Sequence, residues 1–384
     1  MGGNASMTQQ TKTDIIRHFR KPYVRACKAE KSRILDIVIE SSGYSRKHAI
    51  ALLIGPSVPK KKTIRTRSSR YAHLCDILVR IWAASNYLCG KRLKPFLPVL
   101  VESLKHHKEI DLSEEDEALI LRASAATIDR ILAPERKKSV IKGRSTTKPG
   151  TLLKHKIPIR TFAQWTEDRP GFMEVDLVAH TDTTRGEYIN TLNMTDIATG
   201  WTVCTAFMGK GERDCVAGID QVRAMLPFPT LGIDSDNGGE FINAHLMRYC
   251  QRNSITFTRS RPYKKNDQAH IEQKNWDVVR KTIGYGRFDT HKQLDIIKRI
   301  ESLLAFHQNY FQPSQKLISK TRIGAKVRKK YDIAQTPAQR LLARDDVPKE
   351  TKTLLKNTFL KLNPVVLLYA IYDLVEELYD TLPN

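Results

Sequence analysis

The chain has 384 residues and a formal net charge of +23, from 64 Lys and Arg against 41 Asp and Glu. Its hydrophobic content of 41% and aromatic content of 8% are those of a folded protein, which excludes a wholly disordered polycation. The sequence has no long apolar run and no Cys-x-x-Cys pair, so we expect neither a membrane protein nor a secreted disulfide scaffold.

The charge is unevenly distributed. Residues 1–150 carry 30 basic and 14 acidic side chains, and residues 251–350 carry 22 and 10. The region between them, 151–250, is slightly acidic, with 9 basic and 13 acidic side chains. Two basic regions flanking an acidic one favour a polyanionic partner, and nucleic acid is the usual one.

The N-terminal segment predicts a helix, a short Gly-containing turn and a second helix across residues 31–53. We interpret residues 1–56 as a helix-turn-helix DNA-binding domain, with an ordinary helical hairpin as the alternative. The first turn of the second helix carries the expected base contacts Arg46, Lys47 and His48. Residues 57–70 are predicted to be a basic linker that follows phosphates through Lys60, Lys61, Lys62, Arg65 and Arg67.

Residues 71–135 predict a second helical, helix-turn-helix DNA-binding domain. Ser113 and Asp116 have the spacing of a helix start, and Ser124 is predicted to cap a helix that presents Thr127 and Arg130 to DNA. The following segment, 136–164, is rich in Lys and Arg without acids, so we interpret it as a basic tether.

Between 165 and 290 the pattern changes to alternating strands and helices, which predicts an α/β layer fold. The expected strands cover 172–181, 187–196, 201–207, 231–236 and 255–260, and the expected helices cover 211–225, 240–251 and 267–282. The last region, 291–384, is predicted to be mostly helical, at 291–311 and again after residue 351, around a basic middle at 316–344. We expect its apolar segment 363–382 to pack as a helix against a domain or another subunit.

Three acids stand where such a fold gathers chemistry: Asp176 within the first strand, Asp236 at the end of the fourth, and Glu272 early in the last helix. The intervals between them hold 59 and 35 residues. Carboxylates suit hard divalent cations, and two such ions can hold the attacking and leaving oxygens of a phosphoryl transfer. Glu174, Asp234 and Asp182 are the rival ligands.

The motifs Asp-Asn-Gly-Gly-Glu-Phe (236–241), Pro262-Tyr263 and His-Ile-Glu-Gln-Lys-Asn (270–275) together resemble a known family. They are similar to the retroviral-integrase-type catalytic core of bacterial insertion-sequence DDE transposases, whose characteristic second interval is also 35 residues. The resemblance covers about residues 165–290, and the segments 311–317 and 329–342 resemble the tails of such transposases more weakly.

The resemblance implies an RNase H-like core in which Asp176, Asp236 and Glu272 hold two Mg²⁺ or Mn²⁺ ions, with Asp176 bridging them. It implies that Asn275 and Asn237 support this site through hydrogen bonds, Asn275 by bonding Glu272. No zinc is expected, because the paired His and Cys module of retroviral enzymes is missing. Partners would be double-stranded DNA, as transposon ends and target, and further copies of the chain in a dimer or higher oligomer. The expected location is the bacterial cytoplasm, at the nucleoid and not at a membrane.

Within the core, the loop after the fifth strand and the last helix carry the expected DNA contacts. These are Arg259, Arg261, Lys264, Lys265, Lys274, Arg280 and Lys281. Trp276 occupies the position of a DNA-contacting Lys in retroviral enzymes, and we favour a core position for it over base stacking. His180 and His270 are expected to be ordinary hydrogen-bonded histidines, with a supporting role at the metals as the alternative.

We therefore predict a multidomain α plus α/β protein, with N-terminal all-α helix-turn-helix domains, an RNase H-like α/β catalytic core and a mostly α C-terminal region. The predicted activity is that of a DNA transposase or integrase, which binds terminal inverted repeats and catalyses strand cleavage and transfer. The alternatives are a catalytically silent, domesticated DNA-binding protein and a structure-selective nuclease of the same fold.

Overall fold

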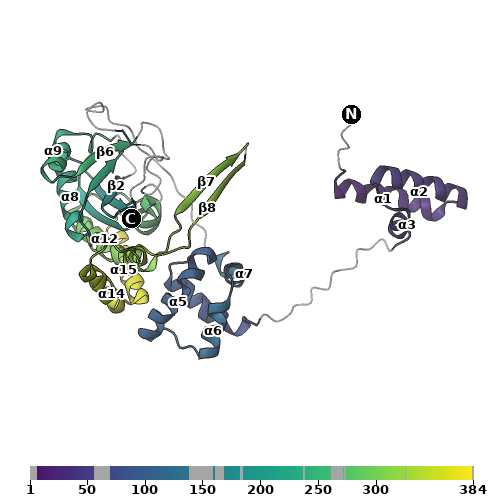
Figure 1. The fold of residues 1–384 in the computed structure, drawn as a ribbon, viewed down its shortest axis with the longest axis horizontal. Coiled ribbons are helices and arrows are strands. Elements are labelled where there is room, and N and C mark those ends of the chain that lie inside the picture. The colour runs from purple at the N-terminus through teal and green to yellow at the C-terminus, as the bar shows by residue number, and fades with distance from the viewer. Residues whose placement is uncertain are drawn as a thin grey trace. The chain divides into compact units, whose positions relative to one another are not determined.

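A computed structural model describes residues 7–55, 70–137, 159–160, 168–181, 185–236, 238–260, 271, 274–324 and 326–382. The chain divides into two compact units, Met1–Ser68 and Ser69–Asn384. Figure 1 shows the elements of both units, which are described separately below.

The N-terminal unit is a bundle of three helices, α1 (Gln9–Arg25), α2 (Lys28–Ser42) and α3 (Arg46–Ile54). Gly43 ends α2 in the left-handed conformation, with φ of 69°, where a residue without a Cβ is favoured. The predicted pair of helices with a Gly-containing turn is confirmed, and α1 is an addition that the sequence analysis did not foresee. The buried side chains that join the three helices are Ile16, Tyr23, Leu35, Val38, Ala49 and Leu53.

The second unit begins with a short 3₁₀ turn (Ala72–Leu74) and the helices α4 (Cys75–Ala84), α5 (Gly90–His106), α6 (Glu114–Arg122) and α7 (Ala125–Arg136). The predicted caps are confirmed, because Ser113 accepts from the Asp116 amide and Ser124 accepts from the Thr127 amide, each at 3.1 Å. These helices share one hydrophobic core with the sheet and the C-terminal helices. Hydrogen bonds also join the two parts, for example from Gln312 Nε2 to the Ser85 carbonyl at 2.8 Å.

A mixed sheet forms the centre of this unit, with strand order β1-β6-β5-β2-β3-β4. β2, β3 and β4 are antiparallel neighbours, while β5 lies parallel to β2, and β6 lies parallel to both β5 and β1. Three antiparallel strands extended by parallel ones on the side of the first strand are the topology of an RNase H-like fold, so the predicted fold class is confirmed. The strands are β1 (Ile159–Arg160), β2 (Phe172–Ala179), β3 (Ile189–Asp196), β4 (Thr202–Met208), β5 (Gly232–Ser235) and β6 (Thr256–Ser260).

Two helices, α8 (Glu212–Met225) and α9 (Ala244–Arg252), pack on one face of the sheet. A Cβ at Gly218 of α8 would lie 2.9 Å from the Phe207 ring and 3.3 Å from Leu192, so the absence of a side chain allows the helix to approach the strands closely. α9 begins four residues later than predicted, because Asn243 accepts from the Leu246 amide at 2.8 Å and caps it there. The other face of the sheet carries Asp176.

The edge strand β4 is covered by the long helix α12 (His291–Phe311), which the sequence predicted with the same bounds. Asn309 accepts from the Thr202 amide at 2.8 Å and donates to the Thr202 carbonyl at 2.7 Å. Glu301, two turns earlier, accepts from the Ala206 amide. Eight residues of helix and four of strand both span about 12–13 Å, so one helix can satisfy the outward peptide groups of an exposed edge.

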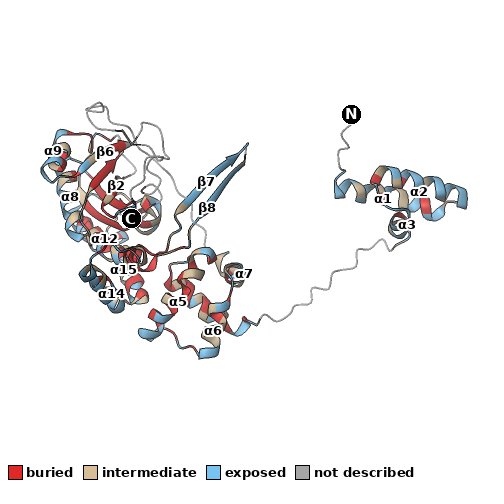
Figure 2. Cartoon of the chain, viewed as in Figure 1, coloured by how far each residue is buried: buried red, intermediate tan, exposed pale blue. Residues whose placement is uncertain are grey.

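The C-terminal region continues with an antiparallel hairpin, β7 (Leu317–Ile323) and β8 (Lys326–Tyr331), and the helices α13 (Pro337–Leu342), α14 (Lys349–Lys361) and α15 (Pro364–Tyr379). α15 packs on α12, as predicted for segment 363–382, and its buried side chains include Leu367, Ile371 and Leu374. The region is mostly helical, as predicted, and the hairpin in its basic middle is an element that the sequence did not predict. Figure 2 shows it as an almost wholly exposed ribbon. Within the described residues no single helix is long and apolar enough to cross a membrane, although the bent pair α14 and α15 passes that test together.

Candidate active site

Asp176 and Asp236 meet on one face of the sheet. β2 and β5 are parallel neighbours, with Glu174 directly beside Asp234, so the residues two positions further along each chain lie side by side on that face. Asp176 is the fifth residue of β2, and Asp236 directly follows the end of β5. The structure thus brings together two of the three acids that the sequence singled out.

The two carboxylates disfavour each other's ionisation. Burial, and then the negative charge of Asp236, raise the pKa of Asp176 well above its ordinary value. Burial also raises the pKa of Asp236, and the charge of Glu240 adds to this effect. Within the described part of the chain, no basic side chain forms an ion pair with either carboxylate. A cation between the two groups would relieve this repulsion.

Hydrogen bonds fix the orientation of both carboxylates. Asn275 Nδ2 donates to Asp176 Oδ2 at 2.5 Å, and the Leu177 amide donates to Asp176 Oδ1 at 2.8 Å. Asn275 is itself held by Asn193 of β3, whose Nδ2 donates to Asn275 Oδ1 at 2.8 Å. The Gly238 amide donates to Asp236 Oδ1 at 2.7 Å. Asn275 therefore positions Asp176, whereas the sequence analysis expected it to support Glu272.

The rival acids Glu174 and Asp234 lie one step deeper on the same face and are buried, with 0% and 2% of their surface exposed. Glu174 Oε2 accepts from the Ile271 amide at 2.7 Å, and Asp234 Oδ1 accepts from Thr258 Oγ1 at 2.5 Å. The first bond ties Ile271, which precedes the helical turns η4 (Asn275–Arg280) and α11 (Lys281–Ile283), to the centre of the sheet, and the second ties β6 to it. The two acids thus have structural partners, while Asp176 and Asp236 lie nearer the surface. Asp182 lies outside the described residues.

The donor set fits a hard divalent cation. Carboxylate oxygens are the ligands that Mg²⁺ and Mn²⁺ prefer, and the crowding of two negative charges here matches a doubly positive ion. Within the described ranges, no group of three or more His, Cys, Asp or Glu side chains is arranged to hold a metal. Glu272 and Asn237, two further residues predicted for this site, lie outside those ranges.

Several predicted DNA contacts in the core are not on the surface. Arg259 lies inside β6 and is 6% exposed, and Lys274 is 9% exposed, so the prediction that they contact phosphates is wrong. Burial lowers the pKa of Lys274 to about 8. Arg280 Nη2 donates to the Ala179 carbonyl at 2.7 Å and so holds the end of β2, while Lys281 is exposed. Arg261, Lys264 and Lys265 lie outside the described residues.

The structure also tests the positions predicted for Trp276 and His180. Trp276 is 39% exposed and lies 6.5 Å from the Tyr285 ring, so the preference for a core position is wrong. His180 is an ordinary buried histidine, as expected, with Nε2 2.8 Å from Thr191 Oγ1. Burial lowers the pKa of His180 to about 3, so it is neutral. His270 lies outside the described residues.

The predicted contacts of the N-terminal helices lie at surface positions. Arg46, Lys47 and His48 are all exposed on α3, and Arg46 pairs with Asp36 at 2.9 Å. Arg130 is exposed on α7, and Thr127 is partly buried against the capping Ser124. The linker residues Lys60, Lys61, Lys62, Arg65 and Arg67 lie outside the described residues.

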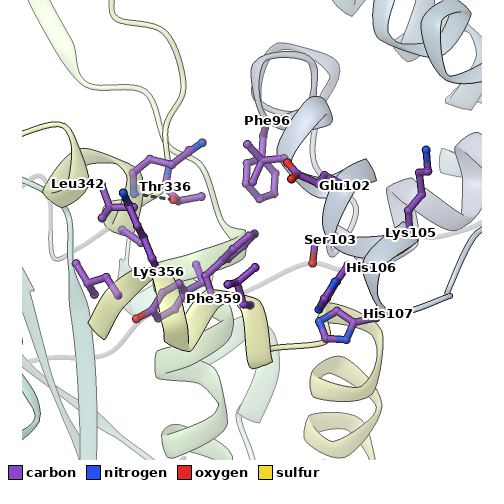
Figure 3. A pocket seen from close by; sticks show the side chains of 16 residues that line it. Phe96, Glu102, Ser103, Lys105, His106, His107, Thr336, Leu342, Lys356 and Phe359 are labelled. Carbon is purple, nitrogen blue, oxygen red and sulfur yellow. Dashed lines mark hydrogen bonds between the residues drawn. The ribbon is translucent and has the colours of Figure 1, made fainter. Parts of the chain in front are cut away.

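A separate cavity of about 800 Å³ lies between α5, α13 and α14 (Figure 3). Its lining is largely apolar and includes Phe96, Leu342 and Phe359. None of the site's carboxylates or amides lines it, so it has no part in the chemistry at Asp176.

Sequence reasoning missed Asn193 and the network that surrounds Thr191. Thr191 Oγ1 is hydrogen-bonded to Glu301 Oε1 at 2.5 Å and to His180 Nε2 at 2.8 Å, so the three side chains form one buried chain. Burial raises the pKa of Glu301 to about 8. The signal in the sequence was the alternation of the polar Thr191, Asn193 and Thr195 with the apolar Leu192 and Met194.

The topology and the paired carboxylates define this chain as an RNase H-like α/β protein with an acidic site on the sheet. The chain belongs to the same protein family as uncharacterized protein y4rM of Sinorhizobium fredii (strain NBRC 101917 / NGR234). The two are 39% identical over 338 residues, which is 87% of this chain and 96% of y4rM. A scan against protein-family models gives no match.

Solved structures with detectable similarity include viral integrases. The catalytic core domain of BIV integrase is 17% identical with a TM-score of 0.30, and covers 44% of this chain and 91% of its own. The HTLV-2 integrase catalytic core domain in complex with magnesium is 13% identical with a TM-score of 0.29, at 38% and 90% coverage. A chain of the simian T-cell lymphotropic virus intasome in complex with PP2A regulatory subunit B56 gamma is 14% identical with a TM-score of 0.33, at 64% and 76% coverage. The assignment of the fold rests on the sheet topology.

Proposed function

We propose that this chain is a DDE-type DNA transposase or integrase, which binds transposon ends and catalyses metal-dependent strand cleavage and strand transfer. The observation that carries the proposal is the pair of Asp176 and Asp236 on adjacent parallel strands, each with a raised pKa. Buried like charges are costly to a fold, and clustered titratable groups with perturbed pKa values are typical of active sites. Glu272, 35 residues after Asp236 in the sequence, is proposed as the third acid.

In this proposal Asp176 and Asp236 would hold divalent cations. Bound Mg²⁺ or Mn²⁺ would supply the charge that activates the attacking oxygen and stabilises the leaving one. Asn275 holds Asp176 in one rotamer, and Asn193 holds Asn275, so the carboxylate does not have to reorganise when the ions bind. The buried acids Glu174 and Asp234 anchor the elements on which these groups stand.

In this proposal two helix-turn-helix elements recognise DNA. The first uses the exposed surface of α3, and the second uses the exposed surfaces of α6 and α7. Their exposed basic residues and their capped short helices support this part of the proposal. Cutting two ends and joining them to a target requires at least two copies of the chain, so we propose a homodimer or a larger oligomer in the complex with DNA.

The test is a cleavage and strand-transfer assay in Mg²⁺ or Mn²⁺, with a labelled duplex taken from the DNA that flanks the coding sequence of this chain. Asp176→Asn, Asp236→Asn and Glu272→Gln are compared with the unaltered chain and with Asp295→Asn, which changes an exposed acid on α12. We expect the three site variants to bind the duplex but not to cut it, and the control to cut normally.

Each outcome assigns a function. Activity retained by one site variant removes that residue from the active site. If the unaltered chain binds the duplex and cuts with neither metal, the proposal fails and the catalytically silent DNA-binding alternative replaces it. Cutting of any branched or hybrid duplex without joining would indicate a nuclease of the same fold.

A further inference from the structure

A partly buried polar network anchors the hairpin β7–β8 to the body of the unit. Lys316 Nζ donates to the Ile197 carbonyl at 2.6 Å, and the Lys316 amide donates to Asp332 Oδ1 at 2.6 Å. Arg340 pairs with Asp332 Oδ2 at 2.6 Å and donates to the Ser314 carbonyl at 2.8 Å. The ends of both strands are therefore fixed to the β3–β4 turn and to α13.

Beyond these anchoring contacts the hairpin is exposed to solvent. Every residue from Ile318 to Ile323, and from Val327 to Tyr331, is exposed, including Ile318 at 59% and Ile323 at 64%. Figures 1 and 2 show the two strands extending from the body of the unit. An isolated two-stranded hairpin is only marginally stable in water, so the solvent-exposed ribbon gains little from its own packing.

The ribbon is basic on both faces. Strand register and alternation place Lys320, Arg322 and Lys329 on one face and Arg328 and Lys330 on the other. The sequence holds no Asp or Glu from 313 to 331, and none of these five residues forms an ion pair with a described acid. Lys320 and Lys329 stand directly opposite each other, and such like-charge pairs destabilise a hairpin. Repulsion between these positive charges destabilises the hairpin by itself, and an anionic partner would relieve that repulsion.

We propose that the β7–β8 hairpin is a duplex DNA-binding element that lies in a groove with its two basic faces against the phosphates of the two strands. A strand of seven residues is about 23 Å long, and the major groove of B-DNA, about 12 Å wide, admits a two-stranded ribbon. The inference rests on the proposed function, because it takes DNA to be the substrate that Asp176 and Asp236 act upon.

Charge argues against two partners from this chain, the N-terminal unit and the hairpin of another copy. Residues 1–55 carry ten Lys and Arg against four Asp and Glu, and a second hairpin would repeat the same charges. Neither the N-terminal unit nor the hairpin of another copy therefore complements this surface. A duplex, with one negative charge about every 1.7 Å along its axis, complements both faces at once.

The experiment measures binding of the full chain to a labelled random-sequence duplex in EDTA, over a range of salt concentrations. The first face is altered by Lys320→Gln with Lys329→Gln, and the second by Arg328→Gln with Lys330→Gln. Lys349→Gln with Lys361→Gln, on exposed positions of α14, is the control with the same change of charge. Lys320→Arg with Lys329→Arg tests whether charge alone is required, and circular dichroism checks folding.

For each face we expect about tenfold or greater loss of affinity near 0.1 M salt. The slope of log K against log salt concentration should also become shallower, by the amount that corresponds to about two phosphate contacts. The control and the arginine variant should bind like the unaltered chain. Unchanged binding in either face variant, or an equal loss in the α14 control, would overturn the proposal. Because EDTA suppresses cleavage, this result is independent of the active site: a chain that never cuts can still show binding that depends on the hairpin.

Discussion

The acidic site and the basic hairpin differ in how their charged side chains are held. The acidic site has two carboxylates, Asp176 and Asp236, which are partly buried. They accept hydrogen bonds from the Asn275 side chain and from the Leu177 and Gly238 amides. The basic residues of β7–β8 are numerous, exposed and held only at the root of the ribbon, by Asp332 and Arg340. In the acidic site hydrogen bonds hold the carboxylates in one orientation. In the hairpin the backbone is held at its base, and the charged side chains are free to change rotamer.

The contrast matches what the two proposals require of each region. Chemistry at a phosphate requires groups held within about half an ångström of the productive geometry, and buried amides supply that positioning. Attraction to a duplex requires only charge within reach of the backbone, and each contact contributes nearly independently. We therefore expect single substitutions to abolish function in the first region and only to weaken it in the second.

The largest effect is expected at Asp176. Asp176→Asn should reduce strand cleavage by about 10³-fold or more while leaving the affinity for DNA unchanged. It should also raise the melting temperature, because it removes a buried charge whose pKa is raised by burial and by Asp236. Cleavage rates and thermal unfolding in EDTA check both parts, and a lower melting temperature would show that the carboxylate is structural.

An intermediate effect is expected at the residue that orients this carboxylate. Asn275→Ala should reduce the cleavage rate by about 10- to 100-fold, because Asp176 loses the 2.5 Å bond from Asn275. The apparent affinity for Mn²⁺ should fall in parallel, which a general loss of stability would not cause. Asn193→Ala, one bond further away, is the comparison and should have a smaller effect; equal effects would mean that the two amides act as one unit.

Glu301 provides a contrast to Asp176, because it is a buried acid with a structural role only. Its pKa rises from 4.5 to about 8 on folding, so the folded chain binds the extra proton and this contribution to stability falls as the pH rises from about 4.5 to 8. The loss is about 1.4 kcal/mol for each pH unit within this window. Glu301→Gln should remove that slope. Melting temperatures of both proteins at several pH values check it, and parallel curves would contradict the prediction.

The smallest effect is expected from one hairpin residue. Lys330→Gln should weaken duplex binding only a few-fold and reduce the salt dependence by about one phosphate contact. A loss as large as that of the two-residue variants would mean that Lys330 makes a specific, positioned contact. In that case the hairpin, like the acidic site, would depend on the exact position of one side chain.

Local patterns in the sequence determined much of this protein. Strand alternation and helical periodicity predicted β2 to β6, α8 and α12 within a few residues, because these signals depend on neighbours along the chain. The caps at Ser113 and Ser124 follow from spacings of three residues. Asp176 and Asp236 could be paired in advance because adjacent parallel strands place their ends at one edge of a sheet.

Tertiary structure alone decided the rest. The bonds that position Asp176 join residues 99 and 82 apart in the chain, and no local pattern encodes such pairs. The sequence of Arg259 and Lys274 reads as surface charge, yet packing buries both. The hairpin was missed because its strands carry Lys and Arg on both faces, so they lack the apolar alternation that marks a strand with one face in a core. Where a residue's role depends on what distant segments bring to it, only the folded chain can assign that role.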